Sequence, residues 1–174
     1  MLIMAKKALL VVDLQNYFID ERTAGLPKRI KQRIESEKYD ELVFTKFINT
    51  LDSNFFLNGW KNCMEPPETD IHPELASYAN DSAVFEKHGF SAFRAEGLHE
   101  YLKRKGIKEI HICGTDTDAC VLASAYDAFE FGYDVKVLED LCASRNGKEF
   151  HEMGMNIIRR NLEFKETSEL PTYE

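Results

Sequence analysis

The segment Ala8-Leu-Leu-Val-Val12 is a run of five apolar residues that stops at Asp13. An apolar run this short, with β-branched residues at its end, is typical of a strand that is buried on both faces of a sheet. Further short stretches rich in apolar residues predict strands over 42–45, 83–86, 107–113 and 133–138.

Helical patterns lie between the predicted strands. Pro27 begins a charged stretch that continues to about Lys38, with Ile30 and Ile34 on one face. Further helices are predicted over 98–105, 118–131 and 148–161. The alternation of strand and helix predicts an α/β fold in which helices cover both faces of a mostly parallel, Rossmann-like central sheet, a three-layer α/β/α architecture.

The last predicted helix is amphipathic. Its apolar residues lead us to expect Phe150, Met153, Ile157 and Ile158 on the face that packs against the sheet.

Composition and charge exclude several classes of protein. The chain has 174 residues, 44% of them hydrophobic, which suits a single domain over 1–174. Its formal net charge of −8 argues against nucleic acid or an anionic membrane as a partner. No apolar stretch approaches the roughly 20 residues of a membrane span. The four cysteines form no CxxC pair, so we expect reduced thiols and a cytoplasmic protein.

Chemically useful side chains follow three of the predicted elements. Asp13 follows the first strand, Lys87 follows 83–86, and Cys120 begins the helix after 107–113. Ligands bind beyond the carboxyl ends of the strands in such sheets, so we expect these side chains to share one crevice. A helix start and a nearby ammonium should lower the pKa of the Cys120 thiol, and a carboxylate can carry its proton. The combination suits nucleophilic acyl transfer.

The same residues also have simpler interpretations. Asp13 can cap a turn, Lys87 can be a solvated side chain, and Cys120 can be a buried core thiol. A nucleotide-binding Rossmann protein is disfavoured, because the segment after the first strand contains no Gly-rich phosphate loop. A thiol-redox role lacks a resolving cysteine at a suitable spacing.

Three segments carry a resemblance to a known family: Val11-Val-Asp-Leu-Gln-Asn-Tyr-Phe18, Glu86-Lys-His-Gly-Phe-Ser-Ala-Phe93 and Gly114-Thr-Asp-Thr-Asp-Ala-Cys-Val121. They resemble the signature stretches of the isochorismatase-like cysteine hydrolases, a superfamily that includes nicotinamidases and N-carbamoylsarcosine amidases. The resemblance continues to His151 and covers almost the whole chain in the right order.

The resemblance implies a role for each of the three side chains. Asp13 would be the general base and acid, Lys87 would stabilise the thiolate, and Cys120 would be the nucleophile. The backbone N–H groups of Asp116 and Cys120 would hold the oxyanion, and the Thr115–Asp116 peptide bond would be cis.

The residues beside the nucleophile have their own expected roles. The resemblance implies that Thr117 holds the loop that presents Cys120. We expect the side chains of Asp116 and Asp118 to cap the following helix at its N-terminus.

The resemblance also implies an aromatic substrate pocket. Phe18 stands where the family places an aromatic residue against the substrate, and Trp60 is near a pocket tryptophan of nicotinamidases, although either can instead be a core aromatic. Nicotinamidases bind a metal through an Asp-x-His pair after their second strand, and Phe47 and Asn49 occupy those positions here. Phe47 suggests an apolar wall, and the loss of both ligands predicts that neither a metal nor any other cofactor is used.

These observations lead to one main prediction and one alternative. We predict a hydrolase that cleaves a small amide, imide or ureido compound through a Cys120 acyl-enzyme intermediate. The alternative is a non-catalytic protein that keeps the fold and binds a small molecule or a partner. The irregular segment 46–82 should select the substrate, and its apolar residues Phe55, Phe56 and Leu57 predict a homo-oligomer.

Overall fold

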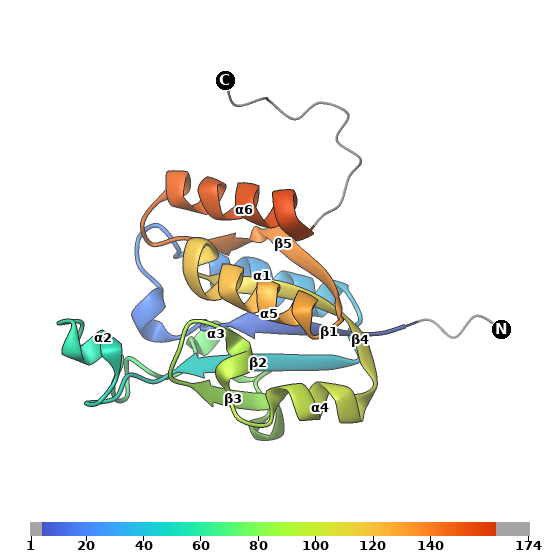
Figure 1. The fold of residues 1–174 in the computed structure, drawn as a ribbon, viewed down its shortest axis with the longest axis horizontal. Helices are drawn as coiled ribbons and strands as arrows, with labels where there is room; N and C mark the ends of the chain where they lie inside the picture. Colours follow the sequence, from blue (N-terminus) through green and yellow to red (C-terminus); the bar gives the residue numbers. More distant parts are fainter. Residues whose placement is uncertain (1–4, 163–174) are drawn as a thin grey trace.

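A five-stranded parallel sheet forms the centre of the protein in a computed structural model, which describes residues 5–162 (Figure 1). The strands are β1 (Lys6–Val12), β2 (Glu41–Phe47), β3 (Val84–Lys87), β4 (Ile107–Thr115) and β5 (Asp134–Ala143). Their spatial order is β3-β2-β1-β4-β5, and every neighbouring pair is parallel. The predicted parallel sheet is confirmed.

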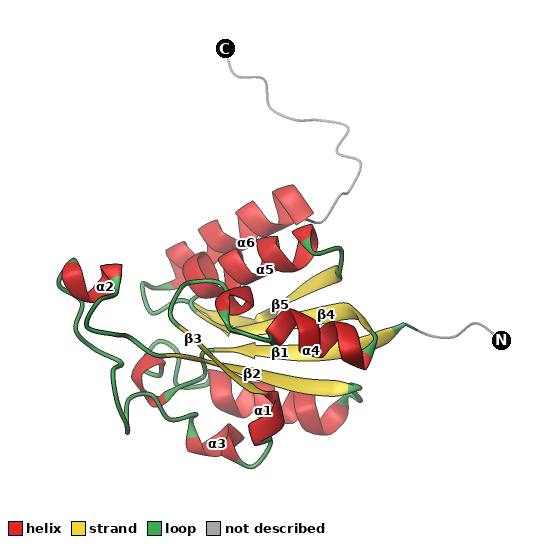
Figure 2. Ribbon diagram, turned by 60° about the horizontal axis from the view of Figure 1, so that its bottom comes forward, coloured by secondary structure: helices red, strands yellow, loops and turns green. Residues whose placement is uncertain are grey.

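Helices cover both faces of this sheet (Figure 2). One face carries α1 (Leu26–Ser36) and α3 (Pro73–Ala76), and the other carries α4 (Leu98–Lys105), α5 (Leu122–Glu130) and α6 (Lys148–Leu162). Shorter elements are α2 (Asn54–Leu57), the 3-10 turns η1 (Asn16–Phe18), η2 (Asp81–Ala83) and η3 (Ala92–Arg94), and the π-helical turn η4 (Thr117–Val121). The predicted three-layer α/β/α architecture is therefore confirmed. Within residues 5–162, no helix is long and apolar enough to cross a membrane.

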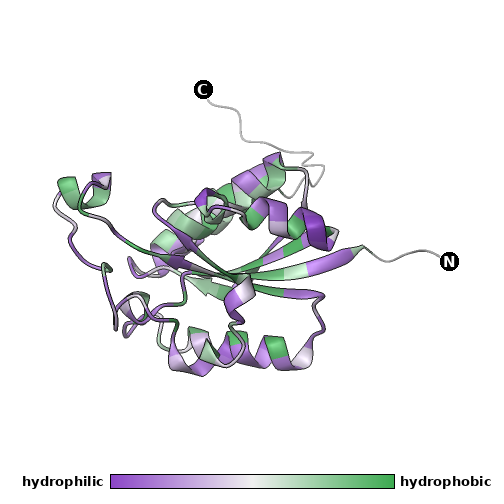
Figure 3. Ribbon diagram, turned by 90° about the horizontal axis from the view of Figure 1, so that it is seen from below, coloured by the Kyte–Doolittle hydropathy of each residue, from purple (hydrophilic) through white to green (hydrophobic). Residues whose placement is uncertain are grey.

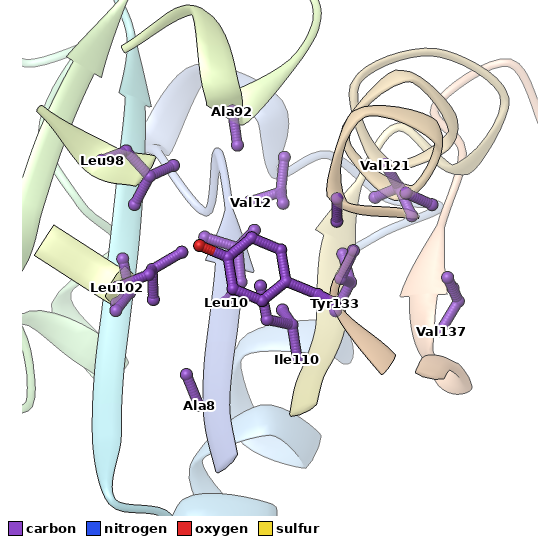
Figure 4. Close-up of a cluster of buried hydrophobic side chains, with 14 of the residues drawn as sticks. Ala8, Leu10, Val12, Ala92, Leu98, Leu102, Ile110, Val121, Tyr133 and Val137 are labelled. Carbon is purple, nitrogen blue, oxygen red and sulfur yellow. The ribbon is translucent and has the colours of Figure 1, made fainter. Parts of the chain in front are cut away.

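The alternation of side chains along β1 explains why both faces are covered. Ala8, Leu10 and Val12 point into the cluster that contains Leu98 and Leu102 of α4 (Figure 4), whereas Leu9 and Val11 belong to the cluster formed with α1 and α3. A strand that is apolar on both faces must be buried on both. The surrounding helices alternate between hydrophilic and hydrophobic residues along their length (Figure 3), as amphipathic helices do.

The strand order changes direction between β1 and β4. The chain leaves β1 through α1 towards β2 and β3, and α4 then returns it to β4 on the opposite side of β1. Loops that leave two adjacent strands in opposite directions open a crevice beyond the strand ends. Asp13 ends β1 and Cys120 follows β4, so the topology alone brings these two residues to that crevice.

The expected inward face of the last helix is mostly wrong. Phe150, Met153 and Ile157 of α6 are each more than 40% exposed, and of the four expected residues only Ile158 is buried. The helix instead turns Gly154 inward, where a Cβ atom would lie 3.0 Å from the backbone of η4. A close contact between two backbones selects the smallest residue rather than the most hydrophobic one, and periodicity of hydrophobicity cannot detect this.

The last strand is longer than predicted. β5 continues from residue 138 to Ala143, past the polar pair Glu139 and Asp140. These two exposed side chains lie between Val137 and Cys142, where the pairing of β5 with β4 shifts register, and an irregularity of this kind on an edge strand lets polar side chains point to solvent.

We predict that Gly114→Ala severely destabilises the fold. Gly114 has φ +128°, and a Cβ atom there would lie 2.1 Å from the carbonyl oxygen of Val12 in the neighbouring strand. Because neither backbone can move without breaking the β1–β4 pairing, we expect a loss of about 3 kcal/mol or more in the free energy of unfolding. Urea denaturation measures it. Gly89→Ala is the control, because its Cβ would meet only Arg94 Cγ at 3.5 Å. Equal stability of the two variants would contradict the prediction.

Candidate active site

Asp13, Lys87 and Cys120 are brought together beyond the carboxyl ends of the strands. The ammonium nitrogen of Lys87 lies 2.8 Å from Asp13 Oδ2 and 3.5 Å from Cys120 Sγ. The side chains of Asp13 and Lys87 are fully buried, and Cys120 is 9% exposed. The expectation of a solvated lysine is therefore excluded, because this lysine lies between a carboxylate and a thiol.

The Lys87 ammonium group is held from several directions. Besides Asp13, it donates hydrogen bonds of 2.8 Å to the carbonyl oxygens of Gly89 and Phe90. Burial lowers the pKa of Lys87, but the negative charge of Asp13, together with its contacts to Asp13 and Cys120, raises it by more, so the net shift is upward. Lys87 is accordingly a fixed positive charge beside the thiol rather than a group that exchanges protons.

Asp13 is oriented by threonines of two other strands. Its N–H donates to Thr45 Oγ1 at 3.2 Å, and the Thr45 hydroxyl donates to Asp13 Oδ1 at 2.8 Å. The Thr115 hydroxyl donates to the Asp13 carbonyl at 3.2 Å. The residue has φ +52°, a left-handed conformation that is uncommon outside glycine and that aspartate tolerates better than most. These contacts leave Oδ2 as the oxygen that faces Lys87.

The electrostatic environment of Cys120 differs from the one expected. Burial is the largest cause and raises the pKa of the thiol, the charge of Asp13 raises it further, and Lys87 only partly opposes them. The expected lowering of this pKa is therefore wrong for the resting site. One reason is that Cys120, the second-last residue of the π-helical turn, is buried. The other is that the ammonium group of Lys87 also pairs with the carboxylate of Asp13. These effects favour the protonated form of the thiol.

Asp116 and Asp118 do not cap the helix as expected. The Asp116 carboxylate accepts hydrogen bonds from Arg145 N at 2.9 Å and Arg145 Nε at 3.3 Å, and Asp118 Oδ2 accepts from Asn146 Nδ2 at 3.3 Å. The loop after β5 thus supplies a backbone N–H and a guanidinium to Asp116 and a side-chain amide to Asp118, and these donors take the place of the N–H groups of the helix. The Thr115–Asp116 peptide bond is cis, as the resemblance implied.

An aromatic cavity of about 270 Å³ opens beside the Cys120 side chain. All three aromatic residues proposed from the sequence, Phe18, Phe47 and Trp60, line it, and Phe55 and Phe90 complete its walls. The ring centroids of Phe47 and Trp60 are 5.6 Å apart, and those of Phe55 and Phe90 are 5.0 Å apart. Phe55 and Trp60 belong to the irregular segment 46–82, so this segment closes the cavity of its own chain.

The sequence analysis missed two polar residues of the cavity, Arg145 and Asn146, besides the lining roles of Phe55, Phe90 and Ala119. The guanidinium carbon of Arg145 lies 4.7 Å from the ring centroid of Phe18. Burial lowers the pKa of Arg145, but the charges of Asp116 and Tyr17 and hydrogen bonds to both together raise it by more, so the net shift is upward. Asp13 and Lys87 were found because polar residues that directly follow a predicted strand were inspected. The same rule could have found Arg145 and Asn146, because both closely follow the true end of β5 at Ala143. Predicting that strand to end at 138 hid them.

The region that supplies metal ligands in nicotinamidases does not suit a metal here. The ring of Phe47 has no donor atom. The Asn49 amide nitrogen donates to the carbonyl oxygens of Trp60 at 2.8 Å and Asn62 at 3.2 Å, while its Oδ1 accepts from Thr50 N at 3.0 Å. The described part of the chain contains no group of three His, Cys, Asp or Glu residues that could hold a metal ion. A reaction without a metal remains a prediction.

Comparisons with known proteins agree with this geometry. Residues 7–169 match the family described as Isochorismatase domain. The chain is 30% identical over 161 residues to the nicotinamidase/pyrazinamidase of Mycobacterium tuberculosis, an alignment that covers 79% of this chain and 86% of that protein. It is 33% identical over 97 residues to isochorismatase domain-containing protein 2 of Xenopus laevis, covering 56% of this chain and only 46% of that protein. Among solved structures, an isochorismatase-like hydrolase from Alkaliphilus metalliredigens is similar with a TM-score of 0.80 and 28% identity, covering 90% of this chain and 92% of that one.

We predict opposite shifts of the Cys120 pKa in two variants. Asp13→Asn removes the negative charge that raises the pKa of the thiol, so its alkylation by iodoacetamide should reach half its maximal rate at a lower pH. Lys87→Met removes the opposing positive charge and should move that midpoint to a higher pH. The rate of alkylation as a function of pH, followed by peptide mapping, measures both shifts.

The control for these measurements is Asp118→Asn, a carboxylate of the same turn that should leave the midpoint unchanged. Among the four cysteines, Cys120 should be labelled first in the unmodified protein, because it lines the cavity beside a lysine and an aspartate. Shifts of the same sign in Asp13→Asn and Lys87→Met, or preferential labelling of another cysteine, would contradict this description of the site.

Proposed function

Because the chain belongs to the isochorismatase-domain family of hydrolases, we propose that it is a cysteine hydrolase that cleaves a C–N bond of a small amide, imide or ureido compound. The observation that carries the proposal is the contact between Asp13, Lys87 and Cys120 beside an aromatic cavity. A thiol, a buried carboxylate and a fixed ammonium in contact supply a nucleophile, a base and a counter-charge. The M. tuberculosis relative, named as a nicotinamidase/pyrazinamidase, supports the same class of reaction.

In the proposed first step, the Cys120 thiol gives its proton to Asp13 as sulfur attacks the carbonyl carbon. The C–S bond forms and the C=O electron pair moves to oxygen. The backbone N–H groups of Asp116 and Cys120 are the proposed donors to this oxyanion, each worth roughly 3 kcal/mol in transition-state stabilisation. Lys87, which is 3.5 Å from the sulfur, stabilises the thiolate as it forms.

In the proposed second step, the tetrahedral intermediate collapses and the C–N bond breaks. Asp13 returns its proton to the leaving nitrogen, which departs as ammonia or an amine and leaves a thioester on Cys120. Water then attacks the thioester while Asp13 takes a proton from it, and the acid product leaves as Cys120 recovers its thiol proton. The same carboxylate therefore acts as a base and an acid in turn, so its orientation by Thr45 matters for both steps.

The cavity limits the size and chemistry of the proposed substrate. A volume of about 270 Å³ is smaller than most sites for drug-sized ligands, which suits a small molecule. Phe18, Phe47 and Trp60 offer aromatic faces for a flat or apolar body, while Arg145 and Asn146 offer hydrogen-bond donors. We propose no metal or other cofactor for the reaction, since Phe47 and Asn49 do not replace the ligands of nicotinamidases.

We further propose that the chain forms a single domain of this family and works in the cytoplasm. The family match over residues 7–169 supports the first part. The four cysteines are all unpaired thiols, which supports a reducing compartment.

We expect ammonia or amine release from at least one small amide, imide or ureido compound, and loss of this release in Cys120→Ala. The screen should compare neutral compounds with compounds that carry a carboxylate, because Arg145 in the cavity is already paired with Asp116. Mass spectrometry of the protein during turnover should detect a covalent adduct on Cys120. Turnover that survives in Cys120→Ala would refute the mechanism, and binding without turnover would favour the non-catalytic alternative.

The same assay tests the expected independence from metal. Dialysis against a strong chelator should leave the rate unchanged, and nicotinamide should be a poor substrate because no metal orients its ring nitrogen. A large loss of rate that Zn²⁺, Mn²⁺ or Fe²⁺ restores would show that ligands come from residues other than 47 and 49.

We also predict that the chain self-associates, and the structure offers two exposed apolar surfaces for it. Leu51 and Leu57 of the irregular segment are 68% and 70% exposed, and Met153 lies on the exposed stripe of α6. Sedimentation at micromolar concentration should detect a species larger than the 20.1 kDa chain. Leu57→Asp and Met153→Asp, compared in the same experiment, identify which surface is used. A monomer in the unmodified protein would rule out the prediction.

A further inference from the structure

The turn that carries Cys120 is held by a residue far away in the sequence. Thr117, the first residue of η4, is fully buried, and its hydroxyl oxygen lies 2.8 Å from Nδ1 of His151 in α6. The two residues are 34 positions apart. Two N–H groups of the turn, those of Ala119 and Val121, both bond to the Asp116 carbonyl oxygen, at 3.0 and 3.1 Å. The hydrogen bond between His151 of α6 and Thr117 therefore holds the first residue of this turn.

A second contact presses α6 against the same turn. A Cβ atom on Gly154 would lie 3.0 Å from Cα and N of Asp118 and from the carbonyl carbon of Thr117. The glycine is needed for space, because all three neighbouring atoms are backbone atoms. His151 and Gly154 are three residues apart and therefore lie on the same face of the helix.

The direction of the His151–Thr117 bond follows from burial. A buried hydroxyl group that donates to nothing is costly, and Nδ1 of His151 is the side-chain partner that Thr117 has. Nδ1 then accepts the hydrogen bond, and the imidazole carries its proton on Nε2. Burial lowers the pKa of His151, which favours this neutral form at physiological pH.

Charged groups surround the imidazole from each element that packs near it. Glu152 and Arg159 lie on α6, Glu139 on β5 and Asp118 on η4, and their effects on the pKa of His151 are smaller than that of burial. Arg22 and Lys148 line the same cavity of about 410 Å³ as His151. The ring is therefore partly open to solvent on one side and fixed to the nucleophile turn on the other.

We propose that His151 is a positioning residue for the nucleophile: its imidazole holds Thr117, and through it the whole η4 turn, so that Cys120 Sγ stays in contact with Lys87. The inference rests on the proposed role of Cys120. It assigns a function in the reaction to a helix that contributes nothing to the cavity walls, since the inward face of α6 supports the turn from behind.

The test compares variants that remove the bond with variants that keep it. His151→Ala and Thr117→Val delete one partner each, whereas His151→Asn and Thr117→Ser retain an acceptor and a hydroxyl. Gly154→Ala should move α6 away from η4, while both partners of the His151–Thr117 hydrogen bond remain. Met153→Ala, on the exposed face of the same helix, is the control.

Three quantities are measured for each variant: kcat and KM on a substrate found by the screen, the alkylation rate of Cys120, and the temperature of unfolding. We expect His151→Ala, Thr117→Val and Gly154→Ala to lower kcat by about 10- to 100-fold with little change in KM, as small displacements of a nucleophile do. The alkylation rate of Cys120 should change in the same three variants. His151→Asn, Thr117→Ser and Met153→Ala should stay close to the unmodified protein.

Two further results bear on the mechanism of positioning. The double variant His151→Ala/Thr117→Val should be no worse than either single variant, because both remove the same bond. If Nδ1 accepts the bond, kcat should fall as pH decreases through the pKa of His151, and this fall should be absent in His151→Asn.

Some outcomes would overturn the inference. Unchanged kcat and alkylation rate in His151→Ala would do so, as would losses that merely follow the unfolding temperature in every α6 variant, including Met153→Ala. The alkylation rates keep the inference separate from the proposed function. If no substrate is turned over, the proposed function fails, and the alkylation series still decides whether His151 positions Cys120.

Discussion

A fully buried ion pair between Asp13 and Lys87 is the constraint on which the rest of the site depends. Removing two charges from water costs several kcal/mol for each ion, and only excellent geometry offsets that cost. β1 and β3 are not neighbours, because β2 lies between them, so the lysine must reach across the end of β2. Phe47, its register partner, places its ring 5.3 Å from the ammonium, and two carbonyl oxygens take further hydrogen bonds from the same group.

The ion pair also determines the state of the nucleophile. Asp13 and Cys120 share one ammonium group, and burial disfavours a second negative charge beside the carboxylate. In the proposed reaction the thiol proton moves to Asp13, and Lys87 contributes a positive charge 3.5 Å from the sulfur. The two neighbouring charges have opposite effects on the pKa of the Cys120 thiol, because Asp13 raises it and Lys87 lowers it.

Two regions that differ greatly in their content of regular secondary structure surround Asp13, Lys87 and Cys120. The irregular segment 46–82 supplies aromatic walls through Phe55 and Trp60. The turn η4 and the loop after β5 form the opposite side, where Asp116 binds Arg145. Helix α6 supports this second side from behind. The segment with least secondary structure thus supplies much of the aromatic lining of the cavity, while Cys120 lies on a turn that packs against a strand and against α6.

The sequence by itself determined the alternation of strands and helices, the positions of Asp13, Lys87 and Cys120 at the ends of elements, and the aromatic character of the pocket. These properties depend on short runs of residues and on motifs, and neighbours in the chain are enough to recognise them. Only the tertiary structure decided the rotation of α6, the raised pKa of Cys120 and the presence of Arg145 in the cavity. Each of these depends on groups that are far apart in the sequence. A contact between two backbones selects Gly154, the burial of a thiol reverses an effect that local charges predict, and β5 resumes its pairing with β4 at Cys142 after an irregular stretch that contains polar residues.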